Sequence, residues 1–130
     1  MAEPKDSFGR CVAKPKFIDR FYEIFLASSP EIKPRFAHTD FAKQKDLLQR
    51  GLTMMVMYDG GSETAKMTLD RIGESHSRRG GINIPPNLYR FWIESLIKTI
   101  SEFDPKFSPE VESAWRHVIQ KGVDYITAKY

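Results

Sequence analysis

The 130-residue sequence predicts an all-α fold. Apolar side chains recur at spacings of three and four along several long segments, which is the period of amphipathic helices. Prolines and glycines separate those segments, and no segment shows a convincing strand pattern. We therefore expect about six to seven helices, the first of them short, joined by brief breaks around a shared core.

Length and composition narrow the class of protein further. Residues 1–130 are enough for a single domain that buries a core and even a planar cofactor. The net charge is +3, but the 20 basic and 17 acidic residues are interspersed, which disfavours nucleic-acid binding. A single cysteine, Cys11, excludes an internal disulfide and fits a reducing compartment. Since no apolar run reaches the roughly 20 residues needed to cross a bilayer, we expect a cytoplasmic protein without membrane contact.

The N-terminal part of the chain predicts two helices. A short one is expected before Pro15, with Phe8 and Val12 turned toward the core. Pro15 suits the start of the next helix, because its fixed backbone angle is compatible with a first turn. Apolar residues then repeat with helical spacing over residues 17–26, and the Ser-Ser-Pro run at 28–30 ends the pattern.

The middle of the chain predicts a tight turn and a long helix. Pro30 and Pro34 bracket a tight turn or single helical turn that ends at Phe36. A helix follows over about residues 41–58, and the Asp-Gly-Gly run at 59–61 stops it. One face of this helix is predicted to carry Gln44, Leu47, Leu48, Gly51, Leu52 and Met55.

The segment over residues 64–79 predicts a helix with an inward histidine. Ser62 suits the cap at its start, and Gly80 and Gly81 close it. Its buried stripe is predicted to hold Met67, Leu69, Ile72 and His76. A neutral imidazole facing an apolar cavity is what a haem iron takes as its fixed axial ligand. The alternative is a core histidine hydrogen-bonded to a neighbour, which is the commoner role of a lone histidine on an apolar face.

Two further helices complete the prediction. One begins at Pro85 and Pro86 and ends at Asp104, and the other opens with Ser108 as its cap and Pro109 at its first position. The apolar face of the first holds Leu88, Tyr89, Trp92, Ile93, Leu96, Ile97 and Ile100. That of the second holds Val111, Trp115, Val118, Ile119, Gly122, Val123 and Ile126.

The order of several residues resembles that of the bacterial globins, most closely the single-domain haemoglobins and the haem domain of flavohaemoglobins. The residues that carry the resemblance are Phe21 and Tyr22, the run 30–36, Gln44 and Leu48, Ile72 and His76, Tyr89, and Ala114 and Trp115. It spans about residues 17–125, and the joint spacing is more specific than any one piece. The chain departs from the family in its short N-terminal helix and in a longer segment between His76 and Tyr89.

This resemblance implies roles on the proximal side of a haem b group. His76 corresponds to the proximal histidine that ligates the iron, and Ile72 would pack under the porphyrin. Phe36 corresponds to the phenylalanine that wedges the haem in its pocket. Tyr89 matches an inward tyrosine near the proximal side, although no glutamate stands where the family often pairs one with it.

On the distal side the resemblance assigns Tyr22, Gln44 and Leu48. The Tyr22 hydroxyl and the Gln44 amide are hydrogen-bond donors of the kind that stabilise a polarised diatomic ligand. The alternatives are an ordinary core aromatic for Tyr22 and a surface amide for Gln44.

Basic and polar residues around the histidine are open to two interpretations. Arg78 and Arg79 would pair with haem propionates, or they are a basic helix end favoured by the helix dipole. Ser75 could accept a hydrogen bond from the second ring nitrogen of His76, as could a backbone carbonyl.

The remaining candidates favour ordinary roles. We expect His38 in an exposed loop and His117 on the polar side of the last helix. Met55 and Trp92 are expected to pack in the core.

These assignments predict a haem protein that reversibly binds dioxygen or another diatomic gas such as nitric oxide or carbon monoxide, as a carrier, buffer or sensor. The alternative is a nitric oxide dioxygenase or peroxidase-type enzyme that draws electrons from a separate reductase. A further alternative is a haem-free globin-like module that binds a partner protein. The last two helices could also supply the seam of a homodimer.

Overall fold

A computed structural model describes residues 3–76 and 85–128 of the chain. Over these residues the backbone forms α-helices and two short 3-10 helices, with no strand, so the all-α prediction is confirmed. The elements in order are α1 (Pro4–Val12), α2 (Phe17–Ala27), η1 (Lys33–Phe36), α3 (Phe41–Asp59), α4 (Glu63–His76), η2 (Pro86–Leu88), α5 (Tyr89–Phe103) and α6 (Pro109–Thr127). None of the described helices is both long and apolar enough to span a bilayer.

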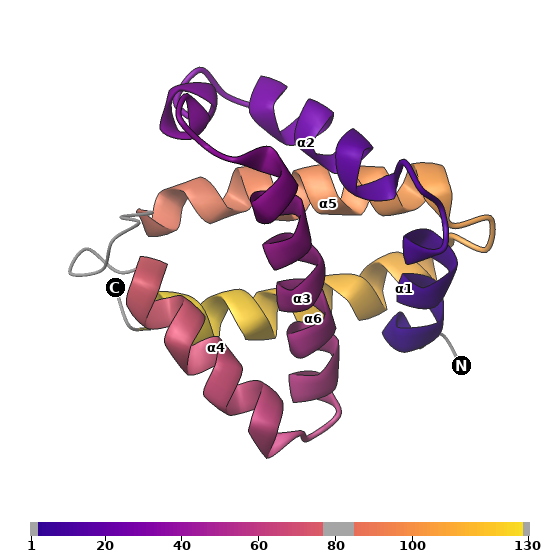
Figure 1. The fold of residues 1–130 in the computed structure, drawn as a ribbon. Helices are drawn as coiled ribbons and strands as arrows, with labels where there is room; N and C mark the ends of the chain where they lie inside the picture. The colour runs from indigo at the N-terminus through magenta and orange to yellow at the C-terminus, as the bar shows by residue number, and fades with distance from the viewer. Residues whose placement is uncertain (1–2, 77–84, 129–130) are drawn as a thin grey trace.

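The helices pack in pairs that cross one another, and α3 lies across the middle of the bundle. In Figure 1, α3 passes in front of α5 and α6, and α4 runs beside it in the lower part of the view. α2 packs on α5, and α4 packs on both α3 and α6. α1 lies at the other end of the bundle, against α6. Because α3 and α4 come from adjacent parts of the chain, the sharp turn at Gly60 and Gly61 brings them side by side.

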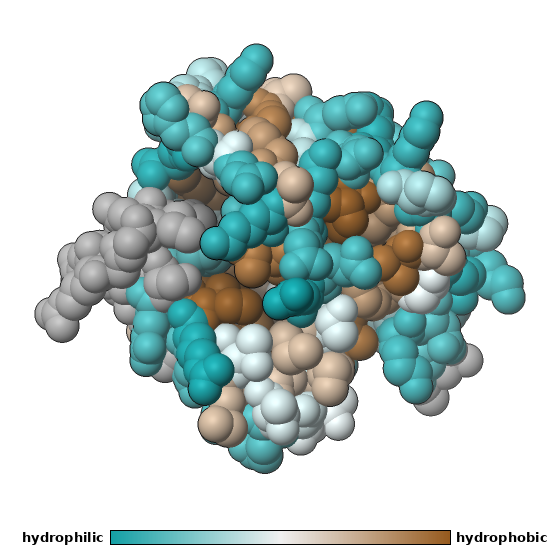
Figure 2. All heavy atoms as spheres, viewed as in Figure 1, coloured by the Kyte–Doolittle hydropathy of each residue, from teal (hydrophilic) through white to brown (hydrophobic). Residues whose placement is uncertain are grey.

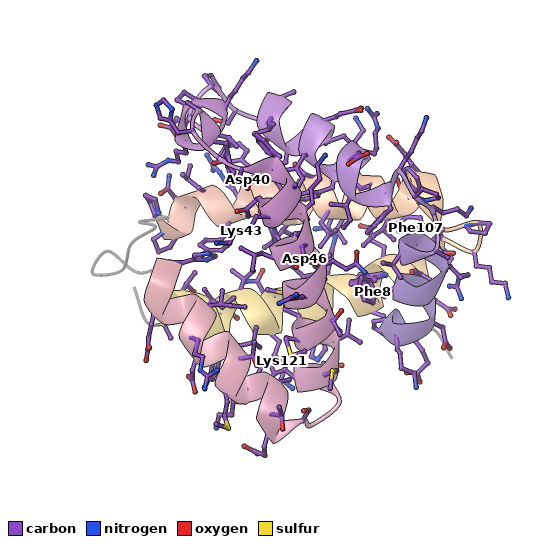
Figure 3. All side chains as sticks on the ribbon, in the orientation of Figure 1. Phe8, Asp40, Lys43, Asp46, Phe107 and Lys121 are labelled. Atoms are coloured by element: carbon purple, nitrogen blue, oxygen red, sulfur yellow. The ribbon has the colours of Figure 1, made fainter. Side chains whose placement is uncertain are left out.

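Side-chain caps define the starts of three helices. Asp40 accepts hydrogen bonds from the backbone amides of Ala42 and Lys43 at 3.1 and 3.3 Å, at the α3 end labelled in Figure 3. Ser62 and Ser108 each accept from the amide three residues further on, at 3.1 and 3.2 Å. The sequence analysis predicted both serine caps and did not identify the Asp40 cap. Each such cap stabilises its helix by about 1 kcal/mol.

Two residues assigned to buried stripes are exposed, so the prediction was wrong for both. Leu47 on α3 is 46% exposed and Met67 on α4 is 59% exposed. Each residue advances a helix by roughly 100°, so Met67 lies far around α4 from the fully buried Leu69. The small residues Ala65 and Gly73 lie on the buried stripe instead. A small side chain is a weak hydrophobic signal, although it allows two helices to approach closely.

The N-terminal helix also differs from its prediction. Ser7 and Cys11 are fully buried, whereas Phe8 and Val12 are half-buried. The Phe8 ring meets the ring of Trp115 edge-on, with centroids 6.2 Å apart. A serine at the centre of a helix interface requires hydrogen-bond partners.

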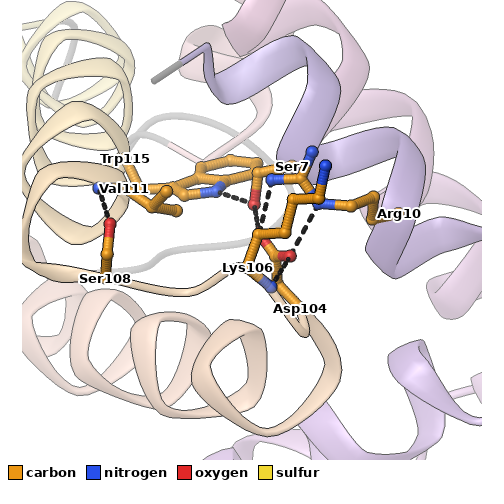
Figure 4. A network of polar contacts seen from close by, with 7 residues as sticks. All are labelled: Ser7, Arg10, Asp104, Lys106, Ser108, Val111 and Trp115. Atoms are coloured by element: carbon orange, nitrogen blue, oxygen red, sulfur yellow. Dashed lines mark hydrogen bonds and ion pairs between the residues drawn. The ribbon is translucent and has the colours of Figure 1, made fainter. Parts of the chain in front are cut away.

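Asp104 and Trp115 are the hydrogen-bond partners of Ser7 (Figure 4). The Ser7 hydroxyl donates to its carboxylate at 2.6 Å, and the Arg10 guanidinium donates through Nε and Nη2 at 2.6 and 2.9 Å. The backbone amide of Lys106 donates to the same carboxylate, and Trp115 Nε1 donates to the Ser7 oxygen at 2.8 Å. These bonds hold the Asp104 pKa at about 2, with the Arg10 bond contributing most. The network joins α1 to α6 and to the end of α5.

α3 and α6 approach each other closely at Gly122. A Cβ atom at this position would lie 2.7 Å from Met55 Cγ and 3.0 Å from its sulfur. Met55 is 5% exposed and cannot move outward freely. The crossing therefore requires a residue without a side chain.

Gly122→Ala is accordingly expected to lower the free energy of unfolding by about 1 to 3 kcal/mol, the usual effect of overpacking a core. Urea denaturation checks this value. Met55→Ala should recover part of the loss when combined with Gly122→Ala. Independent, additive effects of the two changes would mean that the contact does not limit the helix crossing.

Candidate functional site

His76 is the last residue of α4 and lies on the buried stripe of that helix. The stripe also carries Ala65, Leu69 and Gly73, all buried against the bundle. The His76 side chain is half-buried, and this burial lowers its pKa below the usual value. The imidazole is therefore neutral at physiological pH, with a proton on one ring nitrogen and a lone pair on the other.

Tyr89, the first residue of α5, contacts this imidazole. Its hydroxyl lies 3.4 Å from Nδ1 of His76, a long hydrogen-bond distance. Burial raises the pKa of Tyr89 to about 12, so the hydroxyl keeps its proton. If Nδ1–H donates to the Tyr89 oxygen, the lone pair is on Nε2 and that nitrogen can ligate a metal. In that tautomer Nε2 is the ring nitrogen left for an external partner.

Tyr22 lies on α2 and is 4% exposed. Its hydroxyl donates to the backbone carbonyl of Gln44 on α3 at 3.5 Å. Burial raises the pKa of Tyr22 to about 12, which keeps the hydroxyl protonated and able to donate. Gln44 itself is half-buried. This long hydrogen bond links α2 to the first turns of α3.

Aromatic rings surround Tyr22. The Phe36 ring, at the end of η1, stacks on the ring of Phe41 at the start of α3, with centroids 6.1 Å apart and planes 28° apart. Tyr22 meets both rings edge-on, at 6.4 and 5.5 Å. Phe25 meets Phe36 edge-on at 5.8 Å. These contacts tie η1, which lacks buried residues of its own, to α2 and α3.

Leu48 and Ile72 lie on the two neighbouring helices α3 and α4. Leu48 is 8% exposed, and Ile72 is half-buried. A Cβ atom at Gly51, one turn after Leu48, would lie 4.0 Å from Ile72 Cδ1. α3 and α4 therefore pack closely at this level.

The described side chains of this region are of the kinds that contact a flat, mostly apolar group that carries a metal. Several inward aromatic and aliphatic residues on η1, α3, α4 and α5 remain only half-buried, unlike the fully buried core around α6. They are Phe36, Phe41, Ile72, Tyr89 and Trp92. Figure 2 shows the molecule from the same side as Figure 1, with hydrophobic residues in the middle of the view and hydrophilic residues around much of its rim. A neutral imidazole and apolar walls are features that a site for a haem group uses.

The remaining candidates of the sequence analysis are either exposed or outside the described residues. Arg78, Arg79 and the side chain of Ser75 lie outside the described residues. His38 is exposed, as expected for its loop position. His117 is 72% exposed on α6, and its Nε2 lies 3.3 Å from the carboxylate of Asp59.

Phe41 is a residue of the site that the sequence analysis missed. It stacks on Phe36 and contacts Tyr22, so it belongs to the same aromatic wall. The signal was available, because Phe41 precedes Gln44 by three residues and so lies on the same face of α3. The role of Phe41 in the aromatic wall is hidden in the sequence because Phe41 is also the first residue of the predicted helix.

The arrangement of these helices is a globin fold, in which α-helices pack in crossing pairs around a pocket. No model of a protein family matches the chain, and no curated protein matches its sequence. A crystal structure of a protein from Pseudomonas aeruginosa PAO1, described as structurally highly homologous to a human haemoglobin, superposes with a TM-score of 0.91 at 40% sequence identity. The match covers 97% of this chain and 94% of that one.

The chain therefore belongs to the bacterial globin family. An identity of 40% over nearly the whole length, together with the common fold, places it there. The resemblance found from the sequence is confirmed at the level of family and fold.

Proposed function

We propose that the chain binds haem b with His76 as the axial ligand of the iron, and that it reversibly binds dioxygen or another diatomic gas. The observation that carries this proposal is the neutral imidazole of His76, half-buried and with Nδ1 against the Tyr89 hydroxyl. Membership of the globin family supports it.

Each side of the haem has its own residues in this proposal. Phe36, Leu48 and Ile72 supply apolar contacts to the macrocycle, and Tyr89 orients the imidazole. Arg78 and Arg79 pair with its propionates. When bound, the group would supply an iron that can bind a diatomic gas.

Tyr22 and Gln44 provide hydrogen bonds to the gas. The Tyr22 hydroxyl stays protonated because burial raises its pKa to about 12. Its present acceptor, the Gln44 carbonyl, lies 3.5 Å away, which is a weak hydrogen bond. A closer acceptor with partial negative charge would therefore compete well for the same proton.

Titration of the purified protein with haemin tests the proposal. We expect saturation at one haem per chain, with a Soret band, and binding of carbon monoxide after reduction. A protein that is colourless after unbound haemin has been removed would instead support the haem-free module that binds a partner protein.

Tyr22→Phe is expected to speed dioxygen release by about ten- to a hundredfold, because a hydrogen bond to a charged acceptor contributes about 1.5 to 3 kcal/mol. Stopped-flow measurement of the release rate checks this value. Carbon monoxide, a poorer acceptor, should leave at nearly the same rate in both proteins.

Tyr58→Phe is the matched control, since it removes a tyrosine hydroxyl at the opposite end of α3. An unchanged dioxygen release rate in Tyr22→Phe would remove Tyr22 from the ligand side of the haem.

A further inference from the structure

α4 buries few large apolar side chains. Among its described residues, Leu69 is the large side chain that is fully buried, since Ala65 and Gly73 are small. Ile72 is half-buried and Met67 is exposed. Hydrophobic stabilisation scales with buried apolar area, so α4 gains less of it than α6 does. The position of α4 therefore depends strongly on its specific polar contacts.

One of these contacts joins Asp70 of α4 to Tyr125 of α6. The Tyr125 hydroxyl donates to Asp70 Oδ1 at 2.6 Å, and both residues are half-buried. A hydroxyl bonded to a carboxylate at this distance is one of the stronger hydrogen bonds in proteins. The bond with Asp70 raises the pKa of Tyr125 to about 12, so the donor keeps its proton at physiological pH.

The ring of Tyr125 makes a second contact, with α3. Its centroid lies 5.2 Å from that of Tyr58, near the end of α3. The ammonium group of Lys121, labelled in Figure 3, lies 4.9 Å from the centroid of the Tyr58 ring and 3.7 Å from Asp59 Oδ1. Tyr125 thus joins three helices, since α6 carries it, its ring contacts α3 and its hydroxyl contacts α4.

We propose that Tyr125 and Asp70 are positioning residues that fix the rotation of α4 about its axis and so set the orientation of the His76 imidazole. Asp70 precedes His76 by six residues, about 9 Å along the helix. A helix of this length turns as one body, so a constraint at Asp70 is transmitted to its last residue. Because Tyr125 also contacts α3, the constraint sets α4 relative to the helix that carries Gln44 and Leu48. The step from helix to iron rests on the proposed function.

Tyr125→Phe removes the hydroxyl and keeps the ring beside Tyr58. Thr127→Val is the matched control, because it removes a hydroxyl on the same helix that bonds to the Asp124 carbonyl of α6 itself. Asp70→Asn keeps an oxygen acceptor without the charge and should give an intermediate effect.

Amide hydrogen exchange of the haem-free protein is the first readout. In Tyr125→Phe, the amides of α4 should exchange about tenfold faster than in the wild type, while those of α2 stay unchanged. Thr127→Val should match the wild type throughout. Equal exchange of α4 in the two variants would overturn the proposal.

The iron–histidine stretching band of the ferrous haem protein, seen by resonance Raman spectroscopy, is the second readout. The band should shift in Tyr125→Phe, shift less in Asp70→Asn, and stay in place in Thr127→Val. Faster exchange of α4 without any shift would overturn the proposal, because the pair would then hold the helix without orienting the imidazole. Absence of the band in the wild type would contradict the proposed function instead, and the exchange data would still decide whether the pair positions α4.

Discussion

His76→Ala is expected to lose the Soret band when the protein is mixed with stoichiometric haemin. Changes in residues that merely orient a metal ligand weaken metal binding by about 10- to 100-fold, so loss of the ligand itself should reach at least about a hundredfold. The half-buried, neutral imidazole in contact with Tyr89 is the reason for this expectation. Haemin titration followed by absorption spectroscopy measures the change in affinity.

Two comparisons make this result specific. His117→Ala removes an exposed histidine that pairs with Asp59, and it should bind haemin like the wild type. Added free imidazole should restore the Soret band in His76→Ala, because it can occupy the space of the missing side chain. Full haem binding by His76→Ala without imidazole would show that another residue ligates the iron.

Asp104→Ala is expected to lower the free energy of unfolding by about 3 kcal/mol. Breaking a buried ion pair by removing one partner costs about 3 to 5 kcal/mol, and the lower value suits a pair whose arginine reaches solvent. The Asp104 side chain is fully buried, whereas that of Arg10 is 27% exposed. Truncation would also remove the acceptor of the buried Ser7 hydroxyl. Urea denaturation at neutral pH measures the loss.

Glu102→Ala is the control for this prediction. Glu102 pairs with Arg20 at 2.8 Å, but both side chains are more than a third exposed, Glu102 at 35% and Arg20 at 38%. Exposed pairs contribute about 0.2 to 1 kcal/mol. Equal losses in the two variants would mean that burial of Asp104 adds nothing.

The effect of Asp104 should also depend on pH. Its pKa is lowered from the usual 3.8 to about 2 in the folded protein. The unfolded chain therefore takes up the proton first as the pH falls, and the stabilisation, complete above the unfolded pKa, disappears toward the folded one. The difference between the wild type and Asp104→Ala should narrow as the pH falls through this range. A constant difference would contradict the ionic origin of the contact.

The sequence predicted those parts of the fold that local pattern determines. The stripe from Val111 to Ile126 on α6 is buried as expected, and Ser62 and Ser108 cap their helices. Met67 and Leu47 were wrongly placed, because periodicity counts apolar residues and gives small ones little weight. On α4 the packed stripe contains Ala65 and Gly73, which allow close approach without a hydrophobic signal.

Contacts between distant residues could not be predicted. Ser7 and Asp104 are 97 positions apart, and Asp70 and Tyr125 are 55 apart. Each of these residues is polar and, in the sequence, looks like an ordinary surface residue. Only the packing of α1 and α4 against the rest of the bundle gives them partners. The ligand role of His76 follows from pattern and family, and it stays a prediction until the iron is observed.

The most direct test of that role is resonance Raman spectroscopy of the ferrous protein prepared with histidine labelled by ¹⁵N. We predict an iron–histidine stretching band that moves to lower frequency on labelling and that is absent from His76→Ala. A band that ignores the label, or one that persists without His76, would show that the iron is held by a different residue.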